Sequence, residues 1–399
     1  MQPSFEGVKI LFPGRPNWSG WAAHGGEAPF SAAVVDFLGA LSNRLLKDPA
    51  VRAFPDVATF AFFCRRSNLT KLMEAHGADA QRLGRGILFH IAPSNVPINF
   101  AYSLVAGLLS GNRNIVRVSS EPFAQVDLVM QALAALADEH PAVAGRIALV
   151  RYDRANAATA EFSRLCDVRI IWGGDETIGE IRRNPLAPRA FDLTFADRYS
   201  LAVIDAARLL EQQNLRKLAE DFYNDTYLFD QNACSAPHLV VWLGDERAVA
   251  EARERFWQEL TTEVTAKYEF QPAMAVRKLA AFYTQAAAMP IQRVGGPANA
   301  LWRVTMPTLA SGIEDYRCIG GYFTEYLAGS LDEIAPIVTR RYQTLAYFGV
   351  DREALENFVA RHSLPGIDRI VPFGSTTEFS LAWDGYDLIQ TLTRKVSLL

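Results

Sequence analysis

The sequence of 399 residues has few of the features that mark nucleic-acid-binding or membrane-spanning proteins. Charged residues make up only 21%, the formal net charge is −4, and no basic run or basic face dominates, so nothing indicates a nucleic-acid surface. The longest apolar stretch, Ile87 to Leu109, is interrupted by His90, Pro93 and Asn95, which a membrane span rarely carries together. We therefore expect no nucleic-acid partner and no membrane span.

Cysteines and metal-ligand patterns are equally scarce. The four cysteines, Cys64, Cys166, Cys234 and Cys318, form no CxxC pair, and no HxxxH or carboxylate cluster has metal-ligand spacing. The first ten residues lack the basic and apolar regions of a signal peptide. These absences predict reduced thiols, no bound metal and a cytoplasmic location.

The order of apolar runs predicts an α/β protein. The length suggests two or three domains, and the chain has no repeat, low-complexity tract or clear linker, so we expect interleaved domains. Short apolar runs alternate with helical segments from Arg85 onward, which favours a doubly wound parallel sheet that binds ligands at the carboxyl ends of its strands. Strands are expected at Gly86–Ala92, Asn114–Val118, Arg146–Tyr152, Val168–Gly174, Leu201–Ala206 and His238–Leu243. Helices are expected at Pro97–Gly111, Phe123–His140, Ala157–Leu165, Arg208–Tyr223 and Asp245–Lys267.

Cys234 is the cysteine whose surroundings suit catalysis. It lies in DQNACSAP, where small neighbours leave room for a planar carbonyl and the backbone N–H groups of the turn can hold an oxyanion. The alternative is a buried cysteine that acts as a small apolar residue, which we expect for the other three. The nearby His238 and the more distant His90 are expected to be core or strand-edge histidines.

Two turns at strand ends have residues suited to an anion. Pro93, Ser94 and Asn95 follow the strand Gly86–Ala92 and open a helix, whose first N–H groups and dipole attract negative charge. The Asn95 amide can also donate to an oxyanion, although a turn asparagine before a proline is common. Arg117 and Ser119 end the next strand, where an arginine suits the 2′-phosphate of NADPH. A surface arginine is the alternative.

A third turn, WGGDETIG, contains Gly173, Gly174, Thr177 and Gly179. Such a turn allows close approach to a pyrophosphate, although its spacing departs from GxGxxG and a simple tight turn is the alternative. Near the carboxyl end, WDGYD is expected to form a tight turn in which the aspartates bind backbone N–H groups.

In this order, the motifs resemble those of the aldehyde dehydrogenase superfamily. APSNVP resembles its Pro-Trp-Asn-Phe-Pro turn, GNRNIVRVSS its Gly-Asn-x-Val-Val-Leu-Lys-Pro-Ala-Glu strand, GGDETIG its Gly-Ser-x-x-x-Gly turn and DQNACSAP its Gly-Gln-x-Cys. The resemblance implies that Cys234 is the nucleophile and Asn95 the oxyanion-hole amide. It also implies that Arg117 replaces the adenosine-binding lysine and Ser120 the glutamate that often favours NAD.

Departures from the superfamily pattern point to its acylating, reductive branch. The stretch TFADRYSLAVID lacks the glutamate that activates water for aldehyde oxidation, and YRCIGGYF has Arg317 in place of the acid of the ribose motif. NACSAP, FADRYS, and RIVPFG followed by WDGYDL resemble the LuxC-type fatty acid reductases, which reduce acyl-CoA or acyl-protein thioesters.

This resemblance implies an aldehyde-dehydrogenase-like fold of two interleaved doubly wound α/β domains with a small β oligomerisation element. Residues 1–197 plus 349–399 would bind the nucleotide, and residues 198–348 would carry the cysteine. The implied reaction reduces an acyl thioester to the aldehyde with NADPH rather than NADH, in a homo-oligomer that has an acyl-protein synthetase as partner. The alternatives are a cofactor-free cysteine acyltransferase or thioesterase, an acyl-phosphate reductase of the same superfamily, and a non-catalytic relative.

Overall fold

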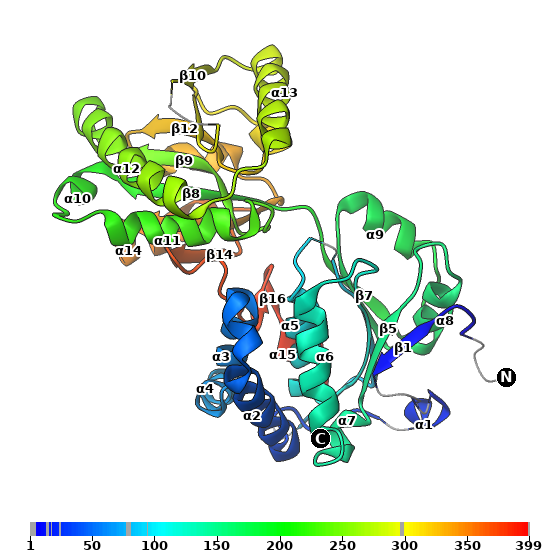
Figure 1. Cartoon of the computed structure of the whole chain (residues 1–399). Helices are drawn as coiled ribbons and strands as arrows, with labels where there is room; N and C mark the ends of the chain where they lie inside the picture. Colours follow the sequence, from blue (N-terminus) through cyan, green and yellow to red (C-terminus); the bar gives the residue numbers. More distant parts are fainter. Residues whose placement is uncertain are drawn as a thin grey trace. The chain divides into compact units, whose positions relative to one another are not determined.

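The chain forms two compact units (Figure 1). The computed structural model describes every residue except 1–4, 13–15, 17, 24, 77–80, 94, 296–298 and 398–399. The first unit contains residues 1–196 and 379–399, and the second contains residues 197–378. We expected residues 349–378 in the nucleotide-binding domain, but they belong to the second unit, because β14 (Arg369–Pro372) pairs in parallel with β13 (Tyr342–Phe348).

The first unit is built on a six-stranded sheet with the order β1–β5–β4–β3–β6–β7. Its strands are β1 (Lys9–Phe12), β3 (Ile87–Ile91), β4 (Arg113–Arg117), β5 (Ile147–Arg151), β6 (Val168–Trp172) and β7 (Phe191–Phe195). All neighbouring strands are parallel except the β1–β5 pair. Counted along the chain from β3, the order β5–β4–β3–β6–β7 is 3-2-1-4-5, the doubly wound order. In this order the chain changes direction across the sheet, at a switch point between the first and fourth strands. Here that point lies between β3 and β6.

Helices cover both faces of this sheet (Figure 1). They are α1 (Trp18–Ala22), α2 (Ala32–Lys47), η1 (Pro49–Ala53), α3 (Pro55–Phe63), α4 (Arg66–His76), α5 (Asn99–Leu109), α6 (Ala124–Leu136), α7 (Pro141–Ala144), α8 (Ala158–Leu165), α9 (Asp175–Arg182) and α15 (Leu388–Thr391). Phe162 of α8 and Ile178 of α9 pack against Phe89 of β3 on one face. On the other face, Ser103 of α5 contacts His90. This two-sided covering confirms the predicted α/β class.

The returning segment completes the first unit with two short antiparallel pairs. These are β2 (Arg82–Gly84) with β17 (Thr393–Lys395), and β15 (Ala382–Trp383) with β16 (Tyr386–Asp387). Asp384 and Gly385 connect β15 to β16 with φ angles of 49° and 75°, as a two-residue hairpin turn requires. The Asp387 carboxylate accepts a hydrogen bond from the Gln390 N–H at 2.9 Å and caps α15. The tight turn predicted for WDGYD is therefore confirmed.

The second unit contains a seven-stranded sheet with the order β10–β11–β12–β9–β8–β13–β14, parallel except for the β10–β11 pair. Its remaining strands are β8 (Tyr199–Asp205), β9 (Pro237–Leu243), β10 (Gln292–Val294), β11 (Trp302–Thr305) and β12 (Tyr322–Ala328). Its helices are α10 (Ala206–Leu210), α11 (Arg216–Thr226), η2 (Tyr227–Phe229), α12 (Glu246–Lys267), α13 (Pro272–Ala288), η3 (Ile313–Tyr316), η4 (Leu331–Ile337) and α14 (Arg352–His362).

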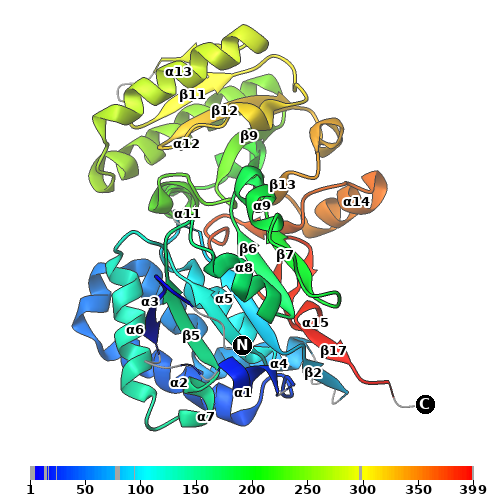
Figure 2. The same ribbon diagram turned by 90° about the vertical axis from the view of Figure 1, so that its right-hand side faces the viewer.

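Helices also cover both faces of the second sheet. Residues of α10, α11 and α12 pack on one face, and residues of η3, η4 and α14 pack on the other. The α13 helix lies alongside β11 and β12 (Figure 2). The single helix expected over Arg208–Tyr223 is instead α10 followed by α11, because the Asn214 side chain accepts from the Arg216 N–H at 2.9 Å and starts a new helix. Among the described residues, no helix is both long and apolar enough to cross a membrane.

Glu325 of β12 is a fully buried carboxylate that joins α12 to this sheet. It accepts hydrogen bonds from Arg253 Nε at 2.9 Å and Arg303 Nε at 2.8 Å. The indole N–H groups of Trp242 and Trp257 also donate to it, each at 2.9 Å. Four donors compensate for the loss of water around the buried charge.

Candidate active site

The loop that carries Cys234, residues 230–236, lies at the amino-terminal edge of the second sheet, because it immediately precedes β9. Asp230 and Gln231 have φ angles of 52° and 61°, in the left-handed region that residues other than glycine adopt infrequently. Tyr268 Oη donates to the Asp230 carboxylate at 2.7 Å, and the Gly320 N–H donates to the Asp230 carbonyl at 2.9 Å. These contacts hold the start of the loop against the sheet.

Gln231 fastens the same loop to β9 and β12. Its side chain is buried, and its amide donates to the Pro237 carbonyl at 2.9 Å and to the Tyr322 carbonyl at 3.1 Å. Its Oε1 accepts from the N–H groups of Gly321 at 2.9 Å and Tyr322 at 3.1 Å. One glutamine side chain thereby satisfies four backbone groups and fixes the residues just before Cys234.

Cys234 itself is half-buried and contacts two neighbouring strands. Gln343 of β13 donates from Nε2 to the Cys234 sulfur at 3.3 Å, and Ser200 of β8 donates from Oγ to the Cys234 carbonyl at 2.7 Å. The other three cysteines are buried, and burial raises the pKa of each thiol. Cys234 is therefore the cysteine best placed to react, which fits the distinction drawn from the sequence.

His238 lies four residues after Cys234 but is not a cationic partner for it. The imidazole is buried, and its ring stacks on Tyr199 with centroids 5.6 Å apart. Burial lowers the pKa of His238 to about 3, with a smaller contribution from the charge of Arg317. The ring is therefore neutral at physiological pH.

In the first unit, the turn after β3 lies at the switch point of the sheet. Asn95 is exposed there, Pro93 is half-buried, and Ser94 lies outside the described residues. The helix expected to open at Pro97 begins at Asn99, because Pro97 and Ile98 form a preceding turn. The Asn99 Oδ1 atom is buried and has no hydrogen-bond partner among the described residues.

A polar network lies behind this turn, inside the first unit. His90 of β3 contacts Ser103 Oγ through Nδ1 at 2.7 Å and Asn114 Oδ1 through Nε2 at 3.0 Å. Because an amide oxygen only accepts, we assign the ring hydrogen to Nε2. Trp172 also donates to Ser103 Oγ, at 3.0 Å, and burial lowers the pKa of His90 to about 4. His90 is a hydrogen-bonded core histidine, as expected.

Arginines end the two neighbouring strands β4 and β5. The Arg117 guanidinium lies 4.9 Å from the centroid of the Tyr152 ring, and its Nη2 donates to the Tyr152 carbonyl at 3.3 Å. Arg151 Nε donates at 2.9 Å to the carbonyl of Ser119, whose Oγ accepts from the Glu121 N–H at 3.1 Å. Arg117 Nε and Arg151 Nη2 are both buried without a partner among the described residues. Because Arg117 pairs with Val150, the side chains of Arg117 and Arg151 point to opposite faces of the sheet.

The glycine-rich turn leads from β6 into α9, with Gly173 before Gly174, the N-cap residue. Thr177 Oγ1 accepts from Arg154 at 3.3 Å. A side chain added at Gly179 would meet nothing within 4 Å, so packing does not require glycine at this helical position. Asp175 and Glu176 occupy the first turn of α9 and oppose an anion there, and the Arg154 guanidinium pairs with Glu180 of the same helix.

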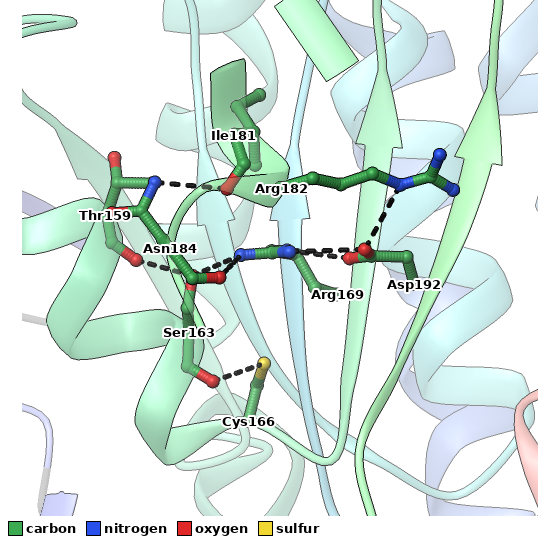
Figure 3. A network of polar contacts seen from close by, with 8 residues as sticks. All are labelled: Thr159, Ser163, Cys166, Arg169, Ile181, Arg182, Asn184 and Asp192. Carbon is green, nitrogen blue, oxygen red and sulfur yellow. Dashed lines mark hydrogen bonds and ion pairs between the residues drawn. The ribbon is translucent and has the colours of Figure 1, made fainter. Parts of the chain in front are cut away.

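A buried ion pair fixes α9 to the sheet (Figure 3). Arg169 of β6 donates to the Asp192 carboxylate of β7 from Nε at 2.7 Å and from Nη2 at 3.1 Å. Its Nη1 donates at 2.8 Å both to Ser163 Oγ of α8 and to the carbonyl of Asn184, just after α9. Arg182 of α9 adds a bond to Asp192 at 3.3 Å. These bonds hold the carboxyl-terminal end of α9 against the sheet.

The predicted residues fall into two groups. Arg117 ends β4, and the turns that contain Asn95 and Gly173 follow β3 and β6, so all three lie at one edge of the first sheet. Cys234 belongs to the second unit. Sequence patterns missed Ser200 and Gln343, whose positions next to Cys234 follow only from strand pairing. They also missed Arg151, although it ends a strand in the same way as Arg117.

Comparisons with known proteins agree with this description. A family model described as Acyl-CoA reductase (LuxC) matches residues 62–395. The long-chain acyl-protein thioester reductase of Aliivibrio fischeri is 24% identical over 322 residues, which cover 78% of this chain and 64% of that protein. The chain thus spans slightly less than two thirds of the length of this relative.

Solved structures show the same fold at low sequence identity. Lactaldehyde dehydrogenase from Escherichia coli superposes with a TM-score of 0.61 and 11% identity, covering 95% of this chain and 87% of that one. The 3,6-anhydro-L-galactose dehydrogenase in complex with NAP gives a TM-score of 0.57 and 12% identity, covering 89% of this chain and 80% of that one. The predicted aldehyde-dehydrogenase-like fold is confirmed.

Proposed function

Because the chain belongs to the acyl-CoA reductase (LuxC) family, we propose that it reduces an acyl thioester, carried by CoA or by a protein, to the aldehyde. The observation that carries the proposal is the environment of Cys234. This thiol is half-buried and accepts a hydrogen bond from Gln343, whereas the other cysteines are buried. The relative named as an acyl-protein thioester reductase supports the substrate class.

In the proposed reaction, the Cys234 thiolate attacks the thioester carbonyl and forms a tetrahedral oxyanion. The Cys234 backbone N–H and the Asn95 amide hold that oxyanion, an arrangement typically worth about 2.7–4 kcal/mol per donor. The carbonyl re-forms as the thiol leaves, and the acyl group remains on sulfur as a thioester. Collapse of the thiohemiacetal formed in the reductive step releases the aldehyde and regenerates the thiol.

We propose that NADPH binds at the carboxyl edge of the first sheet and, when bound, supplies the hydride. Its predicted contacts there are Pro93, Ser94, Arg117, Ser119, Gly173, Gly174, Thr177 and Gly179. The unpartnered Nε of Arg117 and the open space at Gly179 fit a nucleotide with phosphate groups. A neighbour of the same fold, named as a complex with NAP, supports this assignment.

We propose a preference for NADPH over NADH, because the Arg117 guanidinium at the end of β4 can donate charge-assisted hydrogen bonds to a 2′-phosphate. Arg117→Ser should weaken NADPH binding by roughly 10–100-fold, since such bonds are worth about 1.5–3 kcal/mol. NADH binding should change little. Titration calorimetry with both nucleotides measures the difference, and equal losses for both would contradict the role of Arg117 in the preference.

Deacylation by water is not expected. The stretch that holds a water-activating glutamate in aldehyde-oxidising relatives contains Asp197, whose carboxylate accepts from Arg317 Nη2 at 3.0 Å. The stretch contains no glutamate. The acyl-enzyme should therefore survive until it is reduced or exchanged with a thiol.

The test follows NADPH consumption, by its near-ultraviolet absorbance, with a panel of acyl-CoAs. Cys234→Ala should abolish both turnover and acyl-enzyme formation, and Cys318→Ala, at a buried cysteine of the same unit, is the matched control. A labelled acyl adduct that persists in Cys234→Ala would overturn the assignment of the nucleophile.

Two rival activities are separated by the same assay. A cofactor-free acyltransferase or thioesterase would release thiol without consuming NADPH, and NADPH binding would be absent in calorimetry. An acyl-phosphate reductase would consume NADPH with an acyl phosphate but not with acyl-CoA. The absence of turnover with every substrate, acyl-protein included, would favour the non-catalytic relative. The acyl-protein synthetase partner and the homo-oligomer stay predictions, to be tested by co-purification and by light scattering.

A further inference from the structure

Two β-bulges flank Ser200 at the edge of the second sheet nearest the Cys234 loop. Along β9, Ser200 pairs with Pro237 and Leu201 with Leu239, which leaves His238 without a partner in β8. On the other side, Tyr199 pairs with Tyr342 but Leu201 pairs with Leu345, so residues 343–344 of β13 lie opposite Ser200 alone. Bulges bend a strand and redirect its side chains, and they are common next to active sites.

Residues of the β13 bulge connect to both the carbonyl and the sulfur of Cys234. The Thr344 N–H donates to Ser200 Oγ at 3.2 Å, and Ser200 Oγ donates to the Cys234 carbonyl at 2.7 Å. The neighbouring Gln343 amide donates to the Cys234 sulfur at 3.3 Å, while its Oε1 accepts from Thr344 Oγ1 at 3.3 Å. Thr344 therefore orients the amide so that its N–H group points at the sulfur.

We propose that Gln343 is a positioning residue that holds the Cys234 sulfur as a thiolate in the orientation needed for acyl transfer. This inference rests on the proposed function, which makes Cys234 the nucleophile. An N–H donor binds an anionic acceptor more strongly than a neutral one, so the amide favours the thiolate over the thiol. Acylation removes the charge from sulfur and weakens the bond.

Several titratable groups lie on the elements around Cys234. Burial keeps His238 of β9 neutral, and it raises the pKa of Tyr199 in β8 and Tyr342 in β13 above their ordinary value. In the loop, the Asp230 carboxylate accepts from Tyr268, and Arg317 pairs with Asp197. The Gln343 amide that donates to the sulfur is uncharged, so its effect does not itself titrate.

The test is the pH dependence of Cys234 alkylation by iodoacetamide, followed by mass spectrometry of the peptide that contains it. It needs neither substrate nor cofactor. Gln343→Met keeps the side-chain length but removes the donor, and it should raise the apparent pKa of the thiol by about one pH unit, so alkylation at neutral pH slows roughly tenfold. Gln343→Glu places a negative charge beside the sulfur and should raise the apparent pKa further.

Gln285→Met is the matched control, because Gln285 is another buried glutamine of this unit that bonds Tyr322 and Thr324 rather than Cys234. Its alkylation profile should match the wild type even if its stability falls. An unshifted profile in folded Gln343→Met, or in Gln343→Glu if the former does not fold, would overturn the positioning role.

The outcome separates this inference from the proposed function. A shifted profile in a protein that never reduces thioesters would keep the role of Gln343 in thiol activation and reject the reductase. Wild-type reduction with an unshifted Gln343→Met profile would reject the positioning role and keep the reductase.

Discussion

The Gln231→Ala substitution should release the Cys234 loop from the sheet. It removes two donated and two accepted hydrogen bonds and leaves backbone groups of Pro237, Gly321 and Tyr322 without their side-chain partner. An unsatisfied buried group costs about 1–3 kcal/mol. Because some of the four will find water once the loop moves, we expect a loss of about 4 kcal/mol in the local stability of this contact.

Hydrogen exchange measures this loss at the atoms concerned. The amide N–H groups of Gly321 and Tyr322 donate to Gln231, so their exchange should accelerate by roughly 10²–10³-fold, the factor for a loss of about 3–4 kcal/mol. Turnover should fall as well, since Cys234 and Gln343 would no longer keep their separation.

Asn232→Ala is the control, because Asn232 is the exposed neighbour in the same loop. It should leave the exchange of both amides unchanged. If Gly321 and Tyr322 exchange at wild-type rates in Gln231→Ala, the loop is held by other contacts and the reasoning is refuted.

Three further predictions concern separate parts of the chain. His90→Gln should remove a pH dependence of the free energy of unfolding. Burial lowers the His90 pKa from 6.5 to about 4, so the contribution of His90 to stability is full above pH 6.5 and is lost as the pH falls toward 4, with a slope of up to about 1.4 kcal/mol per pH unit. Urea unfolding of variant and wild type at several pH values measures the difference. Gly179→Ala should raise thermal stability, because alanine is more favourable than glycine in an exposed helix by about 1 kcal/mol. The added methyl group should nevertheless weaken NADPH binding in calorimetry, and unchanged binding would place the nucleotide elsewhere. Glu325→Ala should destabilise the second unit by about 3–5 kcal/mol in denaturant titrations, because Arg253 and Arg303 lose their buried counter-charge. A loss below about 1 kcal/mol would show that water replaces the carboxylate.

The first sheet was predictable because local patterns specify it. Each buried parallel strand is a short apolar run in the sequence, and the helices that cover both faces of the sheet alternate with these runs along the chain. β3, β4, β5 and β6 therefore fall close to their expected positions. The edge strand β7 was missed, because its alternating burial produces no continuous apolar run in Phe191–Phe195.

The α13 helix shows why other parts could not be predicted. Its inward face carries Lys278 and Gln285, whereas Val276 and Tyr283 are 70% and 64% exposed, so the usual rule for amphipathic helices would bury the wrong side. Lys278 Nζ is buried because it donates to three backbone carbonyls, of Asn299, Ala300 and Gly321. Such bonds depend on tertiary structure, which periodicity does not report.

The candidate site divides in the same way. Cys234 and Arg117 lie in or next to recognisable motifs, so the sequence is sufficient to select them. Gln343 is 109 residues away from Cys234 along the chain, and only the bulge in β13 brings its amide to the sulfur. A register shift of this kind leaves no signature in a single sequence.

The return of residues 379–399 to the first unit affects the order in which the protein can fold. Arg82 Nε donates to Thr393 Oγ1 at 2.7 Å, although the two residues are 311 positions apart. A ribosome would finish the entire second unit, which is continuous, before it makes the strand that pairs with β2. The first unit is therefore completed last, because β2 has no partner strand and α15 does not yet exist while residues 197–378 are synthesised.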